Sequence, residues 1–163
     1  MTPTVLASSS TDVIGIGDYR VGSTVMASIG LGSCIGLVIH DRKRGCGGLA
    51  HIMLPCANGR NEHPGKYADS APKILVEDLC AQGSRKNSLV AKFVGGAQMF
   101  PGFSAGLNIG ARNIETVREA LTREGICIGA EDVGGSVGRS VIYHPAEQGK
   151  IIVRRADGTC TDI

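Results

Sequence analysis

The chain has 163 residues, a length typical of one domain around one hydrophobic core. Its formal net charge of +2 is spread along the sequence, only 4% of its residues are aromatic, and it has no Trp. A basic groove lined with aromatic side chains, as nucleic-acid binding requires, is therefore not expected. We expect a single domain over residues 1–163, in which 24 glycines between apolar runs predict many tight turns.

The compartment is predicted from the N-terminus and the cysteines. Residues 1–4 contain no Lys or Arg, so a secretory signal peptide is not expected. The six cysteines form no CxxC pair, and without an export signal we expect reduced thiols and a cytoplasmic protein. The spacing of Cys46, His51, Cys56 and His63 matches no common structural zinc pattern, so no metal is expected.

Short runs rich in Val and Ile predict eight strands. They cover residues 13–17, 24–29, 35–40, 48–54, 89–95, 127–132, 140–144 and 150–154. Residues 21–39 carry no charge and are nearly long enough to span a bilayer. The small polar residues in this stretch favour a buried strand, a turn and a second strand instead, so membrane insertion is not expected.

Two amphipathic helices are predicted between the strands. The first is capped by Asp69 or Ser70, has Pro72 in its first turn and ends before Gly83. Its apolar stripe consists of Ile74, Leu75, Leu79 and Cys80.

The second helix covers residues 113–124, with Asn113 as its cap and Gly125 past its end. Ile114, Val117 and Leu121 recur at helical spacing. Strands outnumber helices and do not strictly alternate with them. This pattern favours an α+β fold, a layered sandwich of mixed β-sheets covered by amphipathic helices, over a doubly wound parallel sheet.

One predicted hairpin carries a candidate catalytic pair. If residues 42 and 43 form its turn, Cys34 and His51 are directly opposed on one face, with Cβ atoms about 5 Å apart. A thiol and an imidazole at that separation can share a hydrogen bond, and the imidazole can remove the thiol proton. The prediction depends on the register, because a slip by one residue would move one side chain to the other face.

The glycines before Cys34 leave backbone N–H groups open, and such donors can bind the oxyanion of a tetrahedral intermediate; Gly32 and Ser33 are the candidates. Two alternatives remain. Cys34 can be a buried small hydrophobic residue. Gly30, Gly32 and Gly36 also approximate a dinucleotide-binding fingerprint, but that motif must open a helix, and a β-branched run follows here.

Ordered blocks of sequence carry a resemblance to a known family. They are Gly30-Leu31-Gly32-Ser33-Cys34, Ala50-His51-Ile52-Met53-Leu54-Pro55, Pro64-Gly65-Lys66-Tyr67-Ala68-Asp69, Gly95-Gly96-Ala97 with Met99-Phe100, Asn108-Ile109-Gly110-Ala111-Arg112-Asn113, and Ala130-Glu131-Asp132 with Gly134-Gly135. Over residues 12–156 the chain resembles the CheD family of chemoreceptor glutamine deamidases. The resemblance implies an α+β sandwich similar to the catalytic domains of bacterial toxins that deamidate Rho GTPases.

The resemblance also implies roles for individual residues. Cys34 corresponds to the family's nucleophile and His51 to its histidine. The family has Thr six residues before the cysteine, where this chain has Ser28, whose hydroxyl can orient the imidazole. Thr24, on the same predicted strand, is the alternative. Asp132 lies in one of the blocks and is a candidate to pair with Arg112. The four glycines 95, 96, 134 and 135 are interpreted as turn residues. The remaining histidines, at positions 40, 63 and 144, match no motif and are expected at the surface.

The implied reaction is hydrolysis of a receptor glutamine to glutamate through a thioester on Cys34, with His51 transferring protons and no metal or organic cofactor. The implied substrates are methyl-accepting chemotaxis receptors, and the implied partner is the CheC phosphatase. An adaptor that regulates CheC with little catalysis of its own is the alternative from another functional class. A cysteine amidase for another protein glutamine or a small amide is a third.

Overall fold

The protein was analysed as a computed structural model, which describes residues 10–99 and 108–163. Phe100 of the family block and the N-terminal residues 1–4 lie outside this part of the chain.

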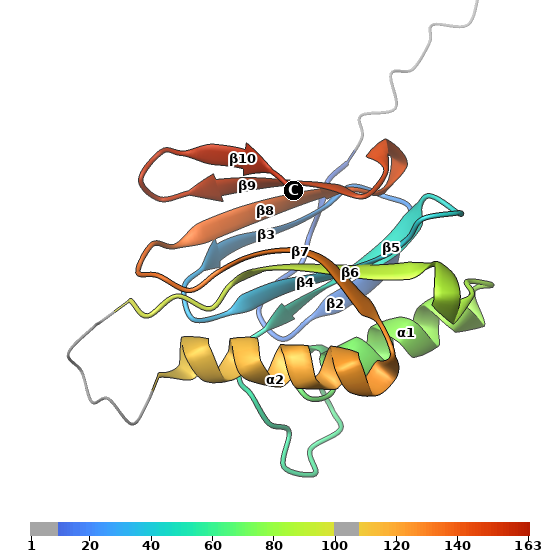
Figure 1. The fold of residues 1–163 in the computed structure, drawn as a ribbon, viewed down its shortest axis with the longest axis horizontal. Helices are drawn as coiled ribbons and strands as arrows, with labels where there is room; N and C mark the ends of the chain where they lie inside the picture. Colours follow the sequence, from blue (N-terminus) through green and yellow to red (C-terminus); the bar gives the residue numbers. More distant parts are fainter. Residues whose placement is uncertain (1–9, 100–107) are drawn as a thin grey trace, which may run out of the picture.

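Within these described residues, ten strands form two mixed five-stranded sheets (Figure 1). Sheet A has the order β1 (Asp12–Val13), β3 (Met26–Leu31), β8 (Arg139–His144), β9 (Lys150–Arg155), β10 (Cys160–Asp162). Sheet B has the order β2 (Tyr19–Gly22), β5 (Cys46–Ile52), β4 (Ile35–Asp41), β6 (Leu89–Gly95), β7 (Cys127–Val133). The pairs β1–β3 and β6–β7 are parallel, and the other pairs are antiparallel.

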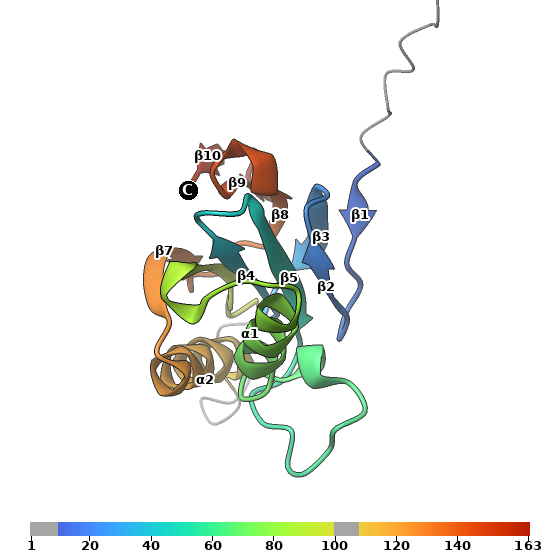
Figure 2. The same cartoon turned by 90° about the vertical axis from the view of Figure 1, so that its right-hand side faces the viewer.

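Helices α1 (Ala71–Ala81) and α2 (Ile109–Glu124) lie side by side on the outer face of sheet B, so the molecule has three layers (Figure 2). Short 3-10 helices lie in the connections at Pro64–Lys66, Lys86–Ser88 and Pro145–Glu147. The predicted class, α+β with mixed sheets and two amphipathic helices, is confirmed. No helix in the described residues is long and apolar enough to cross a membrane.

Strand β4 is buried on both faces because it lies between two hydrophobic cores. Ile35, Leu37 and Ile39 pack with the helices, whereas Val38 packs in the layer between the sheets. Alternate residues of a strand point to opposite faces, so even-numbered positions of β4 face sheet A. The predicted strand, turn and strand in residues 21–39 is thereby confirmed, and β4 leaves no room for a dinucleotide-binding helix.

The predicted strands all occur, with shifted ends, but β2 and β10 were not predicted. The predicted strand 13–17 is too long, since β1 contains only Asp12–Val13. Both missed strands lack the Val- and Ile-rich runs that marked the others. Each lies at the edge of a sheet, where only one neighbouring strand is needed to hold it.

Both helix starts differ from the sequence-based prediction in their capping. The first helix begins at Ala71, after Ser70, but the Ser70 hydroxyl donates to the Pro64 carbonyl at 2.6 Å instead of capping the helix. The second begins at Ile109, four residues earlier than predicted. Its cap is Asn108, whose side chain accepts from the N–H of Ala111 at 3.0 Å. Asn113 therefore lies within α2, where it is fully buried.

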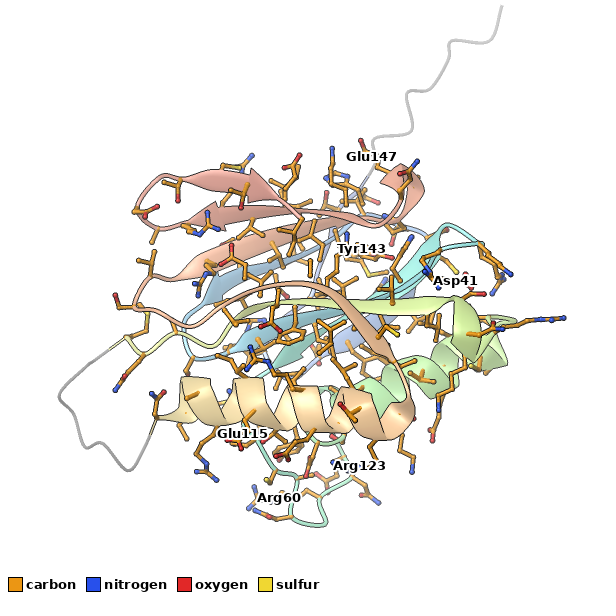
Figure 3. All side chains as sticks on the ribbon, viewed as in Figure 1. Asp41, Arg60, Glu115, Arg123, Tyr143 and Glu147 are labelled. Atoms are coloured by element: carbon orange, nitrogen blue, oxygen red, sulfur yellow. The ribbon has the colours of Figure 1, made fainter. Side chains whose placement is uncertain are left out.

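His40 is buried between the sheets, and its prediction as a surface residue was wrong. Its Nδ1 lies 2.6 Å from the hydroxyl of Tyr143, which is fully buried in the same layer (Figure 3). His63 is exposed as predicted, and His144 is partly buried beside Glu147.

Candidate active site

The short segment 32–34, here called the site loop, links β3 to β4 and is held by its carbonyl groups. Gly32 O accepts from the N–H of Ala97, and Cys34 O accepts from the N–H of Gly96, both at 2.9 Å. Gly96 has φ +67°, and a Cβ there would lie 2.5 Å from Ile114. Only glycine fits this backbone conformation and close packing, which agrees with its interpretation as a turn residue.

The carbonyl of Ser33 is bound by a side chain of α2. Asn113 Nδ2 donates to Ser33 O at 2.9 Å and to Met53 O, just past the end of β5, at 3.1 Å. All three carbonyls of the site loop are therefore occupied. The backbone N–H groups of Ser33 and Cys34, by contrast, have no acceptor among residues 10–99 and 108–163.

Cys34 lies directly before β4, and its half-buried side chain packs against the core between the sheets. Burial raises the pKa of its thiol. Among the described residues, no cation or hydrogen-bond donor contacts the sulfur to offset this effect. The resting state is therefore a thiol, and a nearby base must remove its proton before the sulfur can act as a nucleophile.

The predicted register of the β4–β5 hairpin was wrong by two residues. Its turn comprises residues 42–45, with Asp41 paired to Cys46 and Gly36, not Cys34, opposite His51. The Asp41 carboxylate accepts from the backbone N–H groups of Lys43 at 2.9 Å and Arg44 at 3.2 Å. These two hydrogen bonds stabilise the longer turn.

A shift of two residues keeps side chains on the same face. His51 therefore still points into the layer between the sheets, as Cys34 does. If the pleat of β4 continues to Cys34, the two residues are diagonal neighbours across the ladder, at about 7–8 Å between backbones. No hydrogen bond joins them in the described structure. Proton transfer from the Cys34 sulfur to the His51 ring therefore requires these two side chains to move closer together.

The ring of His51 is buried and held by one hydrogen bond. Its Nδ1 lies 3.3 Å from the carbonyl oxygen of Ile14. A carbonyl can only accept, so Nδ1 carries the proton and Nε2 has the free lone pair. Nε2 is buried and has no hydrogen-bond partner among the described residues. Burial lowers the pKa of His51, although the Ile14 carbonyl and the charge of Asp18 partly oppose this. The ring is thus a neutral base.

Ser28 also lies in this layer and is fully buried. Its hydroxyl donates to Ile14 O at 3.1 Å, so Ser28 and His51 share one acceptor and do not bond directly. Thr24, the alternative, is exposed and donates to the carboxylate of Asp12 at 2.7 Å. The hypothesis that Thr24 replaces Ser28 is therefore wrong, because its hydroxyl is used elsewhere.

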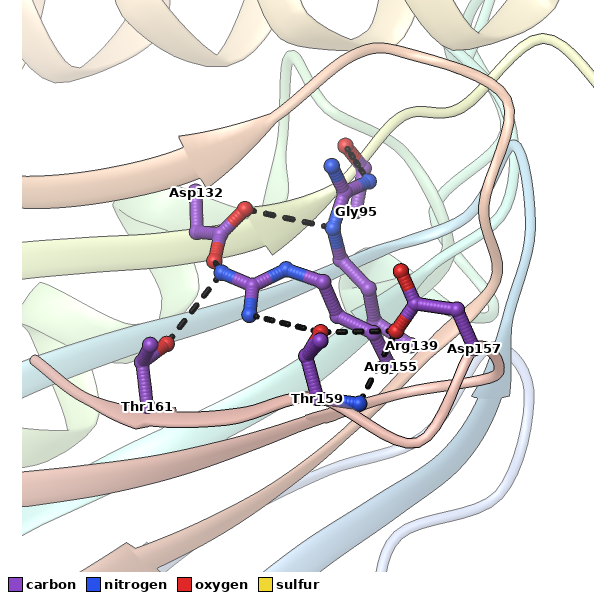
Figure 4. Close-up of polar contacts among 7 residues, drawn as sticks. All are labelled: Gly95, Asp132, Arg139, Arg155, Asp157, Thr159 and Thr161. Atoms are coloured by element: carbon purple, nitrogen blue, oxygen red, sulfur yellow. Dashed lines mark hydrogen bonds and ion pairs between the residues drawn. The ribbon is translucent and has the colours of Figure 1, made fainter.

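A partly buried ion cluster contacts the end of β6, and the two residues that follow β6 hold the site loop (Figure 4). Asp132 of β7 pairs with Arg139 of β8 at 3.2 Å and with Arg155 of β9. These ion pairs connect sheet B, which contains β7, to sheet A, which contains β8 and β9. Arg139 also donates to the carbonyl of Gly95 at 3.4 Å. The predicted pairing of Asp132 with Arg112 was wrong, because Arg112 lies on the exposed face of α2.

A surface cavity of about 650 Å³ adjoins the site loop on the outer face of sheet A. Gly32, Met99 and Arg139 line the end nearest the loop, and apolar residues such as Ile29 and Ile142 line the remainder. Gly32 is the residue of the site loop that lines this cavity, whereas the side chains of Cys34 and His51 face the layer between the sheets and do not line it.

Fold and site together define an α+β protein with a cysteine on a braced loop and a neutral histidine facing the same layer. A family model described as "CheD chemotactic sensory transduction" matches residues 53–155. The chain is 47% identical over 148 residues to the chemoreceptor glutamine deamidase CheD of Thermotoga maritima, covering 90% of this chain and 92% of that protein.

Two further relatives are similarly close. A probable chemoreceptor glutamine deamidase CheD of Archaeoglobus fulgidus is 41% identical, covering 90% of this chain and 94% of the relative. One from Methanosarcina mazei is 45% identical, covering 88% of this chain and 65% of the relative. The chain belongs to the CheD family.

Asn113 is the site residue that sequence reasoning missed. It was interpreted as a helix cap because Asn often begins helices. The available signal was its position, because Asn113 lies beside Ile114 on the apolar stripe that continues through Val117 and Leu121. A buried amide on such a stripe must find hydrogen-bond partners.

Proposed function

We propose that this chain, acting as one catalytic domain, deamidates specific glutamine side chains on methyl-accepting chemotaxis receptors and thereby tunes chemotaxis. Cys34 is the nucleophile, His51 the general base and acid, and Ser28 an indirect support for the imidazole. The observation that carries the proposal is the state of His51. Its Nδ1 is bound to Ile14 O, and its unpartnered Nε2 faces the layer into which Cys34 points.

The names of the relatives supply the substrate class, and the chemistry of the site agrees with it. A thiol with a raised pKa beside a neutral imidazole can react by proton transfer from Sγ to Nε2 as sulfur attacks the carboxamide carbon. The negative charge then develops on the amide oxygen. The unoccupied N–H groups of Ser33 and Cys34, on a loop whose carbonyls are fixed, suit that oxyanion.

The proposed steps balance in atoms and protons. The C–S bond forms, the C–N bond breaks, and His51 gives its Nε2 proton to the departing nitrogen, which leaves as ammonia. Water then attacks the thioester carbon and loses a proton to His51. The C–S bond breaks, and the sulfur recovers its proton. The product is a glutamate, whose new negative charge changes helix packing in the receptor signalling domain. No metal or organic cofactor takes part.

Three further properties belong to this proposal. The CheC phosphatase is the proposed regulatory partner. The cytoplasm is the proposed compartment, because thiols such as that of Cys34 are kept reduced there. The three-layer arrangement supports a fold similar to that of Rho-deamidating toxin domains, which superposition on such a domain would test.

The experiment mixes purified protein with the cytoplasmic fragment of a cognate chemoreceptor and measures ammonia together with receptor mass. Wild type is expected to release ammonia and add about one dalton per modified glutamine, since –NH2 becomes –OH. Cys34→Ala and His51→Gln are expected to lower the rate by about 10²-fold or more. Cys56→Ala, which removes an exposed thiol, is the matched control and should leave the rate unchanged.

Two results would contradict the proposal. If wild type binds the fragment without releasing ammonia, the enzymatic function is contradicted and the adaptor alternative is supported. Ammonia release that persists in Cys34→Ala would assign the reaction to another residue or a contaminant.

A further inference from the structure

Asn113 is a polar side chain on the buried face of α2. It is fully buried and lies one turn before Val117, which packs into the core against sheet B. A buried amide at this position must be satisfied by specific partners. The two partners of its Nδ2 are Ser33 O and Met53 O, one beside Cys34 and the other two residues after His51.

The orientation of the Asn113 amide follows from these partners. Both are carbonyl oxygens, so only the NH2 group can face them, and its two hydrogens serve one each. The Asn113 Oδ1 consequently points elsewhere, and it is buried without a partner among the described residues. The side chain is thus arranged to donate to the two backbone segments that carry Cys34 and His51.

The bond to Ser33 O also fixes the N–H of Cys34. These two groups belong to one planar trans peptide unit, so they point in opposite directions. When α2 holds the carbonyl, the Cys34 N–H is directed away from the helix. A hydrogen bond to the carbonyl also polarises the peptide and makes its N–H a better donor. The flanking carbonyls of Gly32 and Cys34 are held by Ala97 and Gly96, so the peptide cannot rotate freely.

We propose that Asn113 is a positioning residue that orients the Cys34 N–H as the oxyanion donor of the site. It does not touch the substrate, and it acts through the Ser33–Cys34 peptide. Its second hydrogen bond, to Met53 O, keeps the strand that carries His51 in register with the site loop. This inference rests on the proposed function for its role in deamidation, but it also makes a prediction about Cys34 alone.

The prediction separates two reactions of the same sulfur. Acetylation of Cys34 by p-nitrophenyl acetate passes through a tetrahedral oxyanion as the C–S bond forms and p-nitrophenolate leaves. Alkylation by iodoacetamide is a direct displacement of iodide with no oxyanion. A donor that binds the oxyanion accelerates the first reaction and not the second. Loss of a thiolate or of folded protein would instead change both.

The experiment compares wild type with Asn113→Ala, Asn113→Asp and the matched control Val117→Ala, all as the full chain. Both rates are measured at Cys34 by peptide mass spectrometry, which excludes the other five cysteines. Asn113→Ala leaves the Cys34 N–H present but frees its peptide, so acetylation is expected to fall by about tenfold, less than the roughly 10²-fold effect of removing an oxyanion donor outright. Alkylation should change less than about threefold, since it needs no such donor.

Asn113→Asp keeps the shape of the side chain but has at most one proton to donate, so it should also slow acetylation selectively. Val117→Ala should leave the ratio of the two rates unchanged. On receptor fragment, Asn113→Ala should lower kcat while KM stays within about twofold, because ground-state binding is not altered.

Equal acetylation rates in wild type and both Asn113 variants would overturn the inference, as would parallel losses of acetylation and alkylation. A wild type that acetylates normally but releases no ammonia from receptor would contradict the proposed function alone. The selective effect of Asn113 on acetylation would still stand in that case.

Discussion

The side chains of Ser28 and His51 meet on one atom, the carbonyl oxygen of Ile14, and not on each other. The Ser28 hydroxyl donates at 3.1 Å and the imidazole Nδ1 at 3.3 Å. Ser28 therefore anchors the acceptor that holds the ring, and its effect on His51 is indirect. This arrangement predicts a smaller role than that of a residue bonded to the imidazole.

Ser28→Ala is expected to lower kcat by less than about tenfold, because the Ile14 carbonyl still holds the ring. It should also lower the free energy of unfolding by about 1 kcal/mol through the lost hydrogen bond. Steady-state kinetics on receptor fragment and urea denaturation measure the two effects. Thr24→Ala is the control and should keep full activity, since Thr24 binds Asp12. A larger loss of activity in Thr24→Ala than in Ser28→Ala would contradict this assignment.

The protonation states of Cys34 and His51 predict the pH dependence of deamidation. Because burial lowers the pKa of His51, the base stays unprotonated below the usual imidazole value of about 6.5. As the pH falls through this lowered pKa, the base gains a proton and kcat/KM is expected to decline. Because burial raises the pKa of Cys34, its alkylation should increase up to pH values above about 8.5.

A pH series of kcat/KM and of iodoacetamide alkylation measures both properties. Rapid alkylation at pH 6 that does not increase toward pH 8 would indicate a preformed thiolate and imidazolium, contrary to this prediction.

The ion cluster around Asp132 predicts a large stability effect at one position and a small one at its neighbour. Asp132→Ala leaves Arg139 buried without its carboxylate, and the free energy of unfolding is expected to fall by about 3 kcal/mol. Glu131 lies beside Asp132 on β7, and Glu131→Ala removes only its exposed pair with Arg118 of α2, which should cost less than about 1 kcal/mol. Urea denaturation of both variants checks the contrast. Equal losses would show that burial of the cluster is not what stabilises it.

His40 predicts that the protein loses stability in acid. Burial, with a smaller contribution from Lys92, lowers the pKa of His40, and Asp41 opposes this. Between the folded and unfolded pKa values the unfolded chain binds more protons. The free energy of unfolding therefore decreases as the pH falls below about 6.5. The protonated ring has a donor at both nitrogens, so Nδ1 can then only donate to the Tyr143 hydroxyl, which lies 2.6 Å away.

Thermal denaturation at pH 7.5, 6.5 and 5.5 tests this, with His40→Gln expected to show a flatter dependence than wild type. His51→Gln is measured beside it, because His51 is also buried with a lowered pKa and adds to the same trend. An identical slope in His40→Gln and wild type would assign the acid sensitivity to other groups.

The register of the β4–β5 hairpin illustrates how far local sequence can reach. Hydrophobic alternation predicts both strands and places Cys34 and His51 on one face, and the structure agrees on the face. The pairing itself depends on the turn, where the Asp41 carboxylate binds two N–H groups and favours four residues over two. Side-chain hydrogen bonds within a turn are weak signals in a sequence, because many turns are compatible with the same residues.

By itself the sequence determined the α+β class, the main strands, both helices and the family, because periodicity and ordered motifs are local properties of the chain. Only the tertiary structure decided how the site residues are held. Ile14 O lies far along the chain from His51, and Asn113 lies 80 positions from Ser33. Such contacts depend on how two sheets and a helix pack together, and no periodic pattern encodes them.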